Sequence, residues 1–242
     1  MISVCIATYN GEKYIKEQIL SILPQLSDED EIIVSDDGSN DETINVINCI
    51  SDKRITVVYN KENHGFVGNF ENALRNIHGD YVFLCDQDDI WASDKVNKSL
   101  NHLKKYDLIV HNALLIDGNG TSLEKTYYDC LHRKSGFFMN LWKNRFLGCC
   151  MVMKREVVDY CLPFPRNISG HDYWIGMLAL TKYKVCFVDD VLLFYRRHGG
   201  NVSSSSDKSG TSLFYKLFVK RIPLLLDIIK KKISDKMRLH HK

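Results

Sequence analysis

The sequence lacks the features that define several common protein classes. Its eight cysteines form no C-x-x-C pair, and none has a spacing to histidine that resembles a zinc site. No apolar run approaches the roughly 20 residues that span a bilayer, and the first strand pattern, ISVCIAT, has neither a charged lead nor a signal-peptide apolar stretch before it. We therefore expect a cytoplasmic protein with reduced cysteines. Five of them should be buried, namely Cys5, Cys85, Cys149, Cys150 and Cys186.

Missing motifs narrow the function further. No G-x-G-x-x-G follows the first predicted strand, which disfavours a dehydrogenase. The glycine-rich N-terminal signature of nucleotide-sugar-forming nucleotidyltransferases, with its Arg and Lys, is also absent. No recognised nucleic-acid-binding motif is present, so we expect no nucleic acid partner. The sequence contains no internal repeat.

Composition and charge indicate a soluble globular chain with an uneven charge distribution. The 242 residues are 45% hydrophobic and 26% charged, which suits one α/β domain or a domain with a tail. The net charge is only +2, yet residues 212–242 carry nine Lys or Arg against two Asp. The rest of the chain is therefore acidic. A basic tail on an acidic body predicts an anionic partner for the tail.

Apolar spacing predicts alternating strands and helices over the first 90 residues. Strands are expected at four runs: Ile2–Thr8, Glu31–Asp36, Ile55–Tyr59 and Tyr81–Cys85. Helices are expected between them, at apolar repeats that lead up to Pro24, Ile50 and Gly79. An S-x-x-E capping box at Ser39 and Glu42 predicts the start of the second helix. The alternation indicates βαβ units and a mainly parallel sheet.

The second half of the chain is less regular. Strands are expected at three runs: Leu108–His111, Gly148–Met153 and Val185–Val188. A helix is expected from about Asp172 to Leu180. Residues 118–140 are expected to be rich in loops, and the serine run at 203–206 is expected to be flexible. We place the end of the α/β domain at residue 205.

Polar side chains follow three of the predicted parallel strands. The clusters are Thr8-Tyr9-Asn10, Asp36-Asp37-Gly38 and Asp86-Gln87-Asp88-Asp89. One acidic strand end is usually a turn or a helix cap. Ligands of open α/β sheets, however, bind outside the carboxyl ends of the strands. Three such clusters in one half of the domain therefore favour a common site.

The run Asp86-Gln87-Asp88-Asp89 points to a bound cation. Three carboxylates in four residues repel one another unless a cation or ligand lies among them. Hard divalent cations prefer such oxygen ligands, and the offsets exclude an EF-hand. A cation there would stabilise the negative charge of a departing diphosphate. The alternative is a solvated acidic turn before a helix near Trp91.

The motifs together resemble glycosyltransferase family 2, with the GT-A fold. Six segments within about residues 1–205 carry the resemblance: SVCIATYNGEKYIKEQILSIL, VSDDGSNDET, LCDQDDIW, GCCMVMKRE, GHDYWI and FYRRHGGNVS. GHDYW and YRRHGGN look most like the rhamnosyltransferase-like branch, which builds O-antigen, capsule or other bacterial cell-surface polysaccharide. The resemblance implies an α/β fold with a Rossmann-like, mixed and mainly parallel sheet flanked by helices. It implies a nucleotide-binding half at residues 1–105 and an acceptor-binding half at residues 106–205.

The resemblance also implies roles for the residues at the first three strand ends. Thr8, Tyr9 and Asn10 would lie near the base and the ribose. Asp37 would accept the N3–H of a uracil or thymine ring, and a carboxylate is a suitable acceptor for that proton. Asp86 would lie by the ribose and the metal. The expected donor is therefore a UDP- or dTDP-sugar.

Metal binding is implied for three side chains. Asp88 would bind the Mn²⁺ or Mg²⁺ that bridges the diphosphate, together with Asp86, and His198 would close over the diphosphate or the metal. A lone histidine is as often structural, so both readings of His198 stay open. Arg196 and Arg197 could contact phosphate or could be surface cations.

Asp172 matches the position of the catalytic base in the family. In that role its carboxylate removes the proton from an acceptor hydroxyl, which attacks the anomeric carbon opposite the leaving diphosphate. The expected acceptor is a saccharide or a lipid-linked saccharide. The competing reading is an N-cap aspartate at the start of the predicted helix.

Residues 206–242 are expected to form a basic, amphipathic, helical tail. Apolar residues recur there at roughly helical spacing between Lys and Arg, and Pro223 is expected to divide the segment into two short helices. Such a helix is typical of binding to an anionic membrane surface, here the inner face of the plasma membrane. The alternative is a helix that packs on the domain. A non-catalytic, nucleotide-binding scaffold that docks on membrane through this tail is the competing function.

Overall fold

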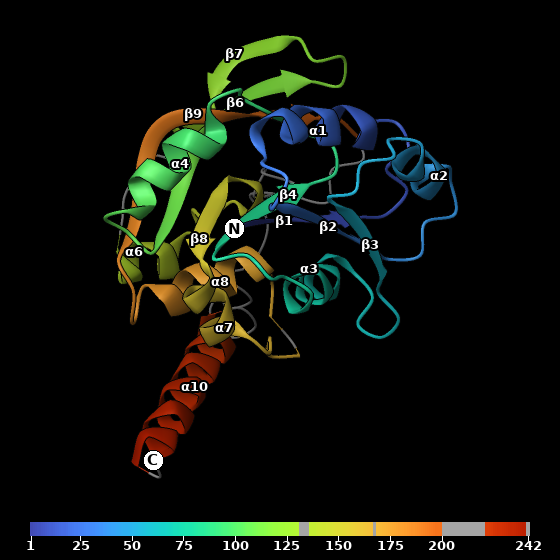
Figure 1. Cartoon of the computed structure of the whole chain (residues 1–242). Helices are drawn as coiled ribbons and strands as arrows, with labels where there is room; N and C mark the ends of the chain where they lie inside the picture. The colour runs from blue at the N-terminus through green and yellow to red at the C-terminus, as the bar shows by residue number, and fades with distance from the viewer. Residues whose placement is uncertain (131–135, 167, 200–220, 241–242) are drawn as a thin grey trace.

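The computed structural model describes residues 1–130, 136–166, 168–199 and 221–240. One mixed sheet runs through this part of the chain, with the strand order β3-β2-β1-β4-β8-β6-β9-β5 and with β7 paired to β6 (Figure 1). The strands are β1 (Ile2–Thr8), β2 (Glu31–Asp36), β3 (Ile55–Tyr59), β4 (Tyr81–Asp86), β5 (Ile90–Trp91), β6 (Leu108–Asp117), β7 (Ser122–Thr126), β8 (Met151–Lys154) and β9 (Val185–Arg197).

Helices cover both faces of the sheet. Figure 1 shows α1 and α2 on one side of β1, β2 and β3, and α3 on the other. The α-helices are α1 (Ile15–Ile22), α2 (Thr43–Asn48), α3 (Phe66–Arg75), α4 (Lys95–Leu103), α5 (Tyr127–Cys130), α6 (Phe137–Trp142), α7 (Arg155–Cys161), α8 (His171–Ala179) and α10 (Ile222–His240). Short 3₁₀ turns lie at Leu23–Gln25 and Gly148–Cys150.

The first half matches the predicted βαβ pattern closely. Strands β3, β2, β1 and β4 are parallel neighbours in that order, and β1 and β4 are buried along most of their length because helices cover both faces. The first predicted helix ends just before Pro24, which sits in the 3₁₀ turn. Of the five cysteines expected in the core, four are buried and Cys186 is half-buried, and all eight are free thiols.

The predicted capping box is wrong. Helix α2 begins at Thr43, and Glu42 precedes it without a side-chain cap. Asp41 instead accepts a hydrogen bond of 3.0 Å from the Thr43 N–H. The Ser39 hydroxyl belongs to the turn after β2, where it donates to Asp36. The S-x-x-E spacing is therefore present, but the serine serves the turn and not the helix.

The second half departs from its prediction in several places. Gly148–Cys150 forms a 3₁₀ turn, and the strand starts only at Met151. Strand β9 extends to Arg197, well beyond the predicted end at Val188. The polar residues after Val188 interrupt the apolar pattern on which the prediction was based. The expected loop at 118–140 contains β7, α5 and α6. The sequence indicated only a helix near Trp91, without bounds; α4 begins at Lys95, carries few apolar residues and buries Lys95 itself.

Helix α10 packs one face on the domain. Leu224 and Ile228 are buried in the main core, and the Lys231 Nζ donates to the Leu162 carbonyl at 3.0 Å. Pro223 lies in the first turn of α10, where proline is tolerated, and does not divide the described helix. Residues 206–220, including the rest of the predicted tail, and the serine run at 203–206 lie outside the described residues. No helix in the described ranges is both long and apolar enough to cross a membrane.

Candidate active site

The predicted strand ends meet at one edge of the sheet. Thr8 at the end of β1 is the register partner of Asp36 at the end of β2, and Ala7 is the partner of Asp86 at the end of β4. The three strands are parallel, so their carboxyl ends share an edge. The polar clusters expected to form a common site are therefore side by side.

Gln87 joins the ends of β1 and β4. Its side-chain oxygen accepts hydrogen bonds from the Thr8 hydroxyl at 2.7 Å and from the Tyr9 N–H at 2.9 Å. A Cβ at Gly11 would lie 2.4 Å from that oxygen, so a larger residue there would displace the Gln87 side chain. Thr8 is almost fully buried, whereas Tyr9 is 52% exposed and can offer its ring to a ligand. Sequence reasoning overlooked Gln87, although it stands in the middle of the acidic run.

The turn after β2 holds Asn10 in place. The Asn10 N–H donates to the Ser39 hydroxyl at 2.9 Å, and the Asn10 Oδ1 accepts from the Asn40 N–H at 2.8 Å. The buried Asp36 carboxylate accepts from the backbone N–H groups of Gly38 and Ser39 at 3.0 and 2.9 Å. Asp36 therefore supports the turn, and Asn10 links it to the end of β1.

Asp37 is held by the loop that precedes α3. Its carboxylate accepts a hydrogen bond of 2.7 Å from Asn60 Nδ2 and another of 2.7 Å from the Gly65 N–H, and His64 Nδ1 lies 2.9 Å away. A carboxylate has about four acceptor positions, so one remains for a ring N–H. His64 is well exposed, at 65%, and can move aside. Its contact with Asp37 had no signal in the sequence pattern.

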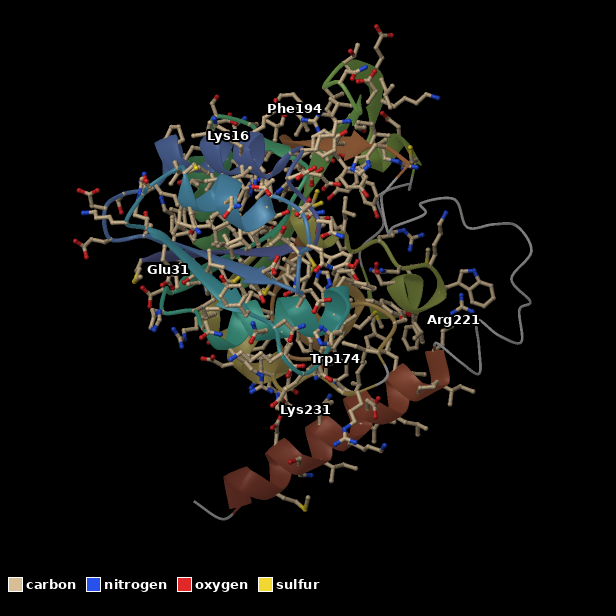
Figure 2. The ribbon with its side chains drawn as sticks, turned by 90° about the vertical axis from the view of Figure 1, so that its right-hand side faces the viewer. Lys16, Glu31, Trp174, Phe194, Arg221 and Lys231 are labelled. Carbon is tan, nitrogen blue, oxygen red and sulfur yellow. The ribbon has the colours of Figure 1, made fainter. Side chains whose placement is uncertain are left out.

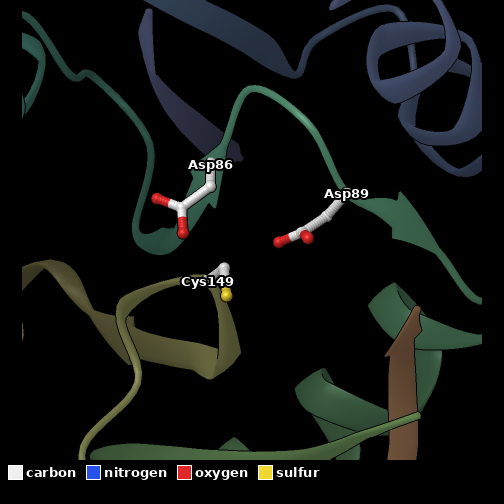
Figure 3. A group of neighbouring side chains, drawn as sticks. All are labelled: Asp86, Asp89 and Cys149. Carbon is white, nitrogen blue, oxygen red and sulfur yellow. The ribbon is translucent and has the colours of Figure 1, made fainter. Parts of the chain in front are cut away.

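The acidic run after β4 is electrostatically unsatisfied. Asp86, Asp89 and Cys149 bring one ligand atom each to within 4.8 Å of one another (Figure 3). Burial, and then the neighbouring Asp88 charge, raises the pKa of Asp86 to about 7 and raises the pKa of Asp89 as well. The Asp89 Oδ2 atom is buried without a hydrogen-bond partner among the described residues. The negative charge of the cluster therefore exceeds the positive charge around it.

Asp88 and His198, both predicted to bind metal, are in direct contact. The His198 Nε2 lies 2.7 Å from the Asp88 Oδ2, and the His198 ring packs on Tyr14 with a centroid distance of 5.0 Å. The two lie 110 residues apart in the sequence; the resemblance placed both at a metal, and the fold shows that they are in direct contact. The third predicted ligand, Asp86, lies close enough for the Asp88 charge to affect its pKa.

Arg196 ties the end of β9 to the acidic run. Its Nε donates to the Asp88 carbonyl at 2.8 Å, its backbone N–H donates to Asp89 Oδ1 at 2.9 Å, and its Nη2 contacts the Glu17 carboxylate at 2.7 Å. The side chain is 2% exposed, so Arg196 is not a surface cation. It fixes the strand end that sets His198, two residues later, against Asp88.

Lys95 is a buried cation beneath the acidic run. Its Nζ donates to the Cys149 carbonyl at 3.0 Å and lies 4.3 Å from the centroid of the Trp91 ring. Burial lowers its pKa, and the nearby Asp89 charge opposes that shift. Lys95 offsets part of the negative charge of the cluster. A lysine at a buried position of an otherwise polar helix had no distinct signal in the sequence.

Asp172 lies in the first turn of α8, in a partly buried position. The N-cap of α8 is Gly170, so the N-cap reading of Asp172 is wrong. The Tyr173 N–H donates to the Asp172 carboxylate at 2.7 Å. Burial raises the pKa of Asp172 to about 6, and its charge reaches Asp86 strongly enough to raise the pKa of that residue. A carboxylate with this pKa is ionised at neutral pH and is a better base than a free aspartate.

His171, next to Asp172 in the sequence, anchors α8 to α3. Its ring stacks on Phe70 with a centroid distance of 3.9 Å, and a Cβ at Gly148 would lie 2.5 Å from its Nε2. Burial lowers its pKa to about 3, so the ring is neutral. The neutral ring and the glycine together let α8 approach the turn that carries Cys149.

The fold and this edge define the class of protein. The parallel strands β2, β1 and β4 carry acidic turns at their carboxyl ends, and the sheet continues into a mixed second half. This is the GT-A architecture. The glycosyl transferase family 2 model matches residues 3–162, and the chain belongs to that family. The chain is therefore a transferase that acts on sugars.

Several known proteins align with this chain over most of their length. An uncharacterised glycosyltransferase of Haemophilus influenzae is 30% identical over 91% of this chain and 88% of its own. The putative teichuronic acid biosynthesis glycosyltransferase TuaG of Bacillus subtilis is 28% identical over 89% and 86%. The dTDP-rhamnosyl transferase RfbG of Shigella flexneri is 26% identical over 90% and 78%. Homologues of this chain thus include enzymes of bacterial polysaccharide synthesis.

Solved structures share the fold at low identity. TarS of S. aureus, residues 1–349 in complex with UDP-GlcNAc, has a TM-score of 0.66 and 21% identity, over 85% of this chain and 61% of that one. The mannosyltransferase PcManGT of Pyrobaculum calidifontis, in complex with GDP-Man and Mn²⁺, has a TM-score of 0.59 and 22% identity, over 80% and 56%. This chain therefore spans less than two thirds of either structure.

Proposed function

We propose that the protein is an inverting glycosyltransferase of bacterial cell-surface polysaccharide synthesis. It moves a sugar from a UDP- or dTDP-sugar to a hydroxyl of a saccharide or a lipid-linked saccharide. The observation that carries the proposal is that Asp172, a carboxylate with a raised pKa, lies close enough to the acidic run for its charge to raise the pKa of Asp86. A base on one side of an anomeric carbon and a diphosphate site on the other is the arrangement that inversion requires.

In this mechanism the Asp172 carboxylate takes the proton of the acceptor hydroxyl. The acceptor oxygen forms the new bond to the anomeric carbon while the bond from that carbon to the diphosphate oxygen breaks, and the electron pair leaves with the diphosphate. General base catalysis of this kind is worth about 10²–10⁴-fold. Partial burial and the Tyr173 N–H hold the carboxylate in position.

The acidic run fits a divalent cation. Asp86 and Asp88 offer the oxygen ligands that Mn²⁺ and Mg²⁺ prefer, and His198 would add a ring nitrogen. The fit rests on the raised pKa of Asp86 and on the unpartnered buried oxygen of Asp89, since both are relieved by added positive charge. Burial raises the pKa of the Cys149 thiol, so it stays protonated and is a poor ligand for a hard cation. When bound, the cation would stabilise charge on the leaving diphosphate.

Asp37 and the first strand end are proposed to bind the nucleotide. The free acceptor position of Asp37 suits the N3–H of uracil or thymine, and guanine offers a different pattern at that edge. Tyr9 offers an exposed ring, while Thr8 and Asn10 fix the turn beneath it. Rhamnose is the donor sugar that we would test first, because RfbG is named as a dTDP-rhamnosyl transferase.

We place the enzyme at the cytoplasmic side of the membrane, where a lipid-linked acceptor would be within reach. The boundary between domain and tail at residue 205 stays part of this proposal.

The test is a panel of nucleotide sugars, scored for diphosphate release with Mn²⁺ and lipid-linked or soluble saccharide acceptors. We expect release from a UDP- or dTDP-sugar that depends on acceptor and is lost in Asp172→Asn. The matched control is Asp159→Asn, an exposed carboxylate on α7, which should retain full activity. Release from GDP-sugars alone, or equal activity in both variants, would refute the proposal.

A further inference from the structure

Helix α10 presents two opposite faces, and only one of them is covered. Leu224, Ile228, Lys231 and Asp235 repeat every three or four residues and point to the domain: the first two are buried, Lys231 contacts Leu162, and the Asp235 charge helps to raise the pKa of Tyr160. Figure 2 shows Lys231 on the side of the helix nearest the domain. At about 100° per residue, these four positions form one narrow stripe.

The opposite stripe is apolar and open. Leu226, Ile229, Ile233 and Met237 lie about 180° around the helix from the packed face. Each is between 51% and 56% exposed, on successive turns of one helix. A row of four such side chains is unusual on a surface that meets only water. We call these four residues the open stripe.

Charge around the open stripe has a single sign. The exposed charged residues of the described part of α10 are Lys230, Lys232 and Lys236, which lie along the borders of the stripe. Its two acidic residues are only half-exposed: Asp227 lies 3.4 Å from Lys230, and Asp235 faces Tyr160. The exposed face of α10 therefore combines apolar side chains with lysines and carries no exposed carboxylate.

Helix α6 extends this surface at the start of α10. Arg221 donates to the carbonyls of Leu141 and Trp142, and its guanidinium lies 4.8 Å from the centroid of the Trp142 ring. Trp142 is 63% exposed and Phe138 is 82% exposed. Figure 2 shows Arg221 at the upper end of α10, beside α6. Aromatic rings next to cations are typical of the membrane interface, where one end of a side chain is apolar and the other is wet.

We propose that the open stripe, its lysines and the exposed aromatic residues of α6 form a docking surface for an anionic lipid bilayer. The packed face of α10 fixes the helix to the domain, so the surface is preformed and does not need the tail to detach. The apolar residues enter the headgroup boundary, and the lysines pair with anionic headgroups. This proposal depends on the proposed function at one point: access to a lipid-linked acceptor is the reason why the enzyme would dock on a membrane.

The experiment measures binding of the full chain to vesicles by flotation. One set contains phosphatidylglycerol and phosphatidylcholine, and the other contains phosphatidylcholine alone. We expect binding to the anionic vesicles at low salt and at least tenfold weaker binding to the neutral ones. Binding should weaken further as salt screens the lysines. Equal binding to both sets, or none to the anionic set, overturns the proposal.

Two variants and a control locate the surface. Ile229→Ser with Ile233→Ser should lower binding about tenfold, and Lys232→Gln with Lys236→Gln should lower it by about fivefold per lysine. The control, Leu20→Ser with Leu123→Ser, removes two equally exposed apolar residues from α1 and β7 and should bind as wild type does. Unchanged binding of the stripe variant, or an equal loss in the control, contradicts the assignment.

Two further readouts separate the alternatives. Sedimentation across a range of concentrations tests whether a second copy of the chain covers the stripe; self-association lost in the stripe variant, without vesicle binding, overturns the proposal. Transfer to a soluble acceptor should be unchanged in the stripe variant, because the surface lies outside the site. Vesicle binding without any transfer would instead leave the docking surface standing and reject the proposed function.

Discussion

Two acidic turns at the same edge of the sheet differ in how their charge is satisfied. After β2, Asp36 and Asp37 accept hydrogen bonds from backbone N–H groups and from Asn60. After β4, burial and mutual repulsion raise the pKa of Asp86 and Asp89, and one buried oxygen has no partner in the described structure. The carboxylates after β2 are therefore stabilised by groups of the protein itself. The carboxylates after β4 need added positive charge.

We propose that the turn after β2 recognises the nucleotide and that the turn after β4 takes part in the reaction. Satisfied carboxylates are rigid and stabilise the fold, so they suit the reading of a base by shape and hydrogen bonds. Unsatisfied carboxylates destabilise the fold and are retained where function needs them. Asp172 belongs with the second group, because burial also raises its pKa. Each prediction below tests one side of this contrast.

The largest effect should come from the unsatisfied turn. Asp88→Ala removes a proposed metal ligand and the partner of His198, so transfer should fall by about 10³-fold or more. The measurement is the initial rate of diphosphate release at saturating donor. Asp28→Ala, which removes an exposed carboxylate, serves as the control and should keep the wild-type rate. A rate for Asp88→Ala within threefold of wild type would place the metal elsewhere.

The base should give the next effect. Asp172→Asn keeps the size of the side chain but loses the proton acceptor, so turnover should fall about 10²–10⁴-fold while donor affinity is kept. In the wild type, kcat/KM should decline as the pH falls below about 6, because the carboxylate becomes protonated there. Rate measurements from pH 5 to 8, with calorimetry of donor binding, test both. A collapse of donor affinity would make Asp172 a binding residue.

A smaller effect is expected at the satisfied turn. Asp37→Ala should weaken UDP or dTDP about tenfold or more, because a hydrogen bond to a charged acceptor is lost. It should leave the metal requirement of any residual transfer unchanged. Calorimetry of UDP, dTDP and GDP on both proteins measures this. Tighter binding of GDP than of UDP by the wild type would overturn the nucleotide assignment.

The smallest effects concern stability and should have opposite signs in the two turns. Above pH 7, Asp86→Asn should raise the free energy of unfolding by about 1–3 kcal/mol, because it removes a charge that the fold disfavours. At pH 4 the effect should vanish. A raised pKa means that the folded state binds more protons between about pH 4 and 7, so wild-type stability is lost as the pH rises through that window.

Asp36→Asn should instead lower the free energy of unfolding by about 1–3 kcal/mol at neutral pH, because acceptors of backbone N–H groups are lost. Urea unfolding at pH 4 and pH 8 measures both variants. If both variants change the free energy of unfolding in the same direction at pH 8, the two turns do not differ in the way proposed.

The sequence predicted the first half of the fold better than the second. Runs such as Ile2–Thr8 are buried on both faces and therefore carry a plain apolar signal, whereas β9 mixes exposed and buried residues past Val188. The capping box failed because Ser39 had two possible partners and the turn offered the better one. Local pattern cannot decide such competition.

The site was predicted residue by residue through resemblance, and its assembly came from the fold. The contact of Asp88 with His198 joins residues 110 apart in sequence, and the placement of Lys95 beneath the acidic run depends on burial. Gln87 and Arg196 act through hydrogen bonds that no spacing rule encodes. The predicted roles of these side chains toward nucleotide, metal and acceptor remain predictions.

The most direct test of the account is the metal requirement of transfer. Purified protein is assayed with its best nucleotide sugar in EDTA, and Mn²⁺ or Mg²⁺ is then added in excess. The account predicts negligible transfer in EDTA and full recovery with the cation, because the turn after β4 holds too little positive charge without it. Full activity in EDTA would contradict it.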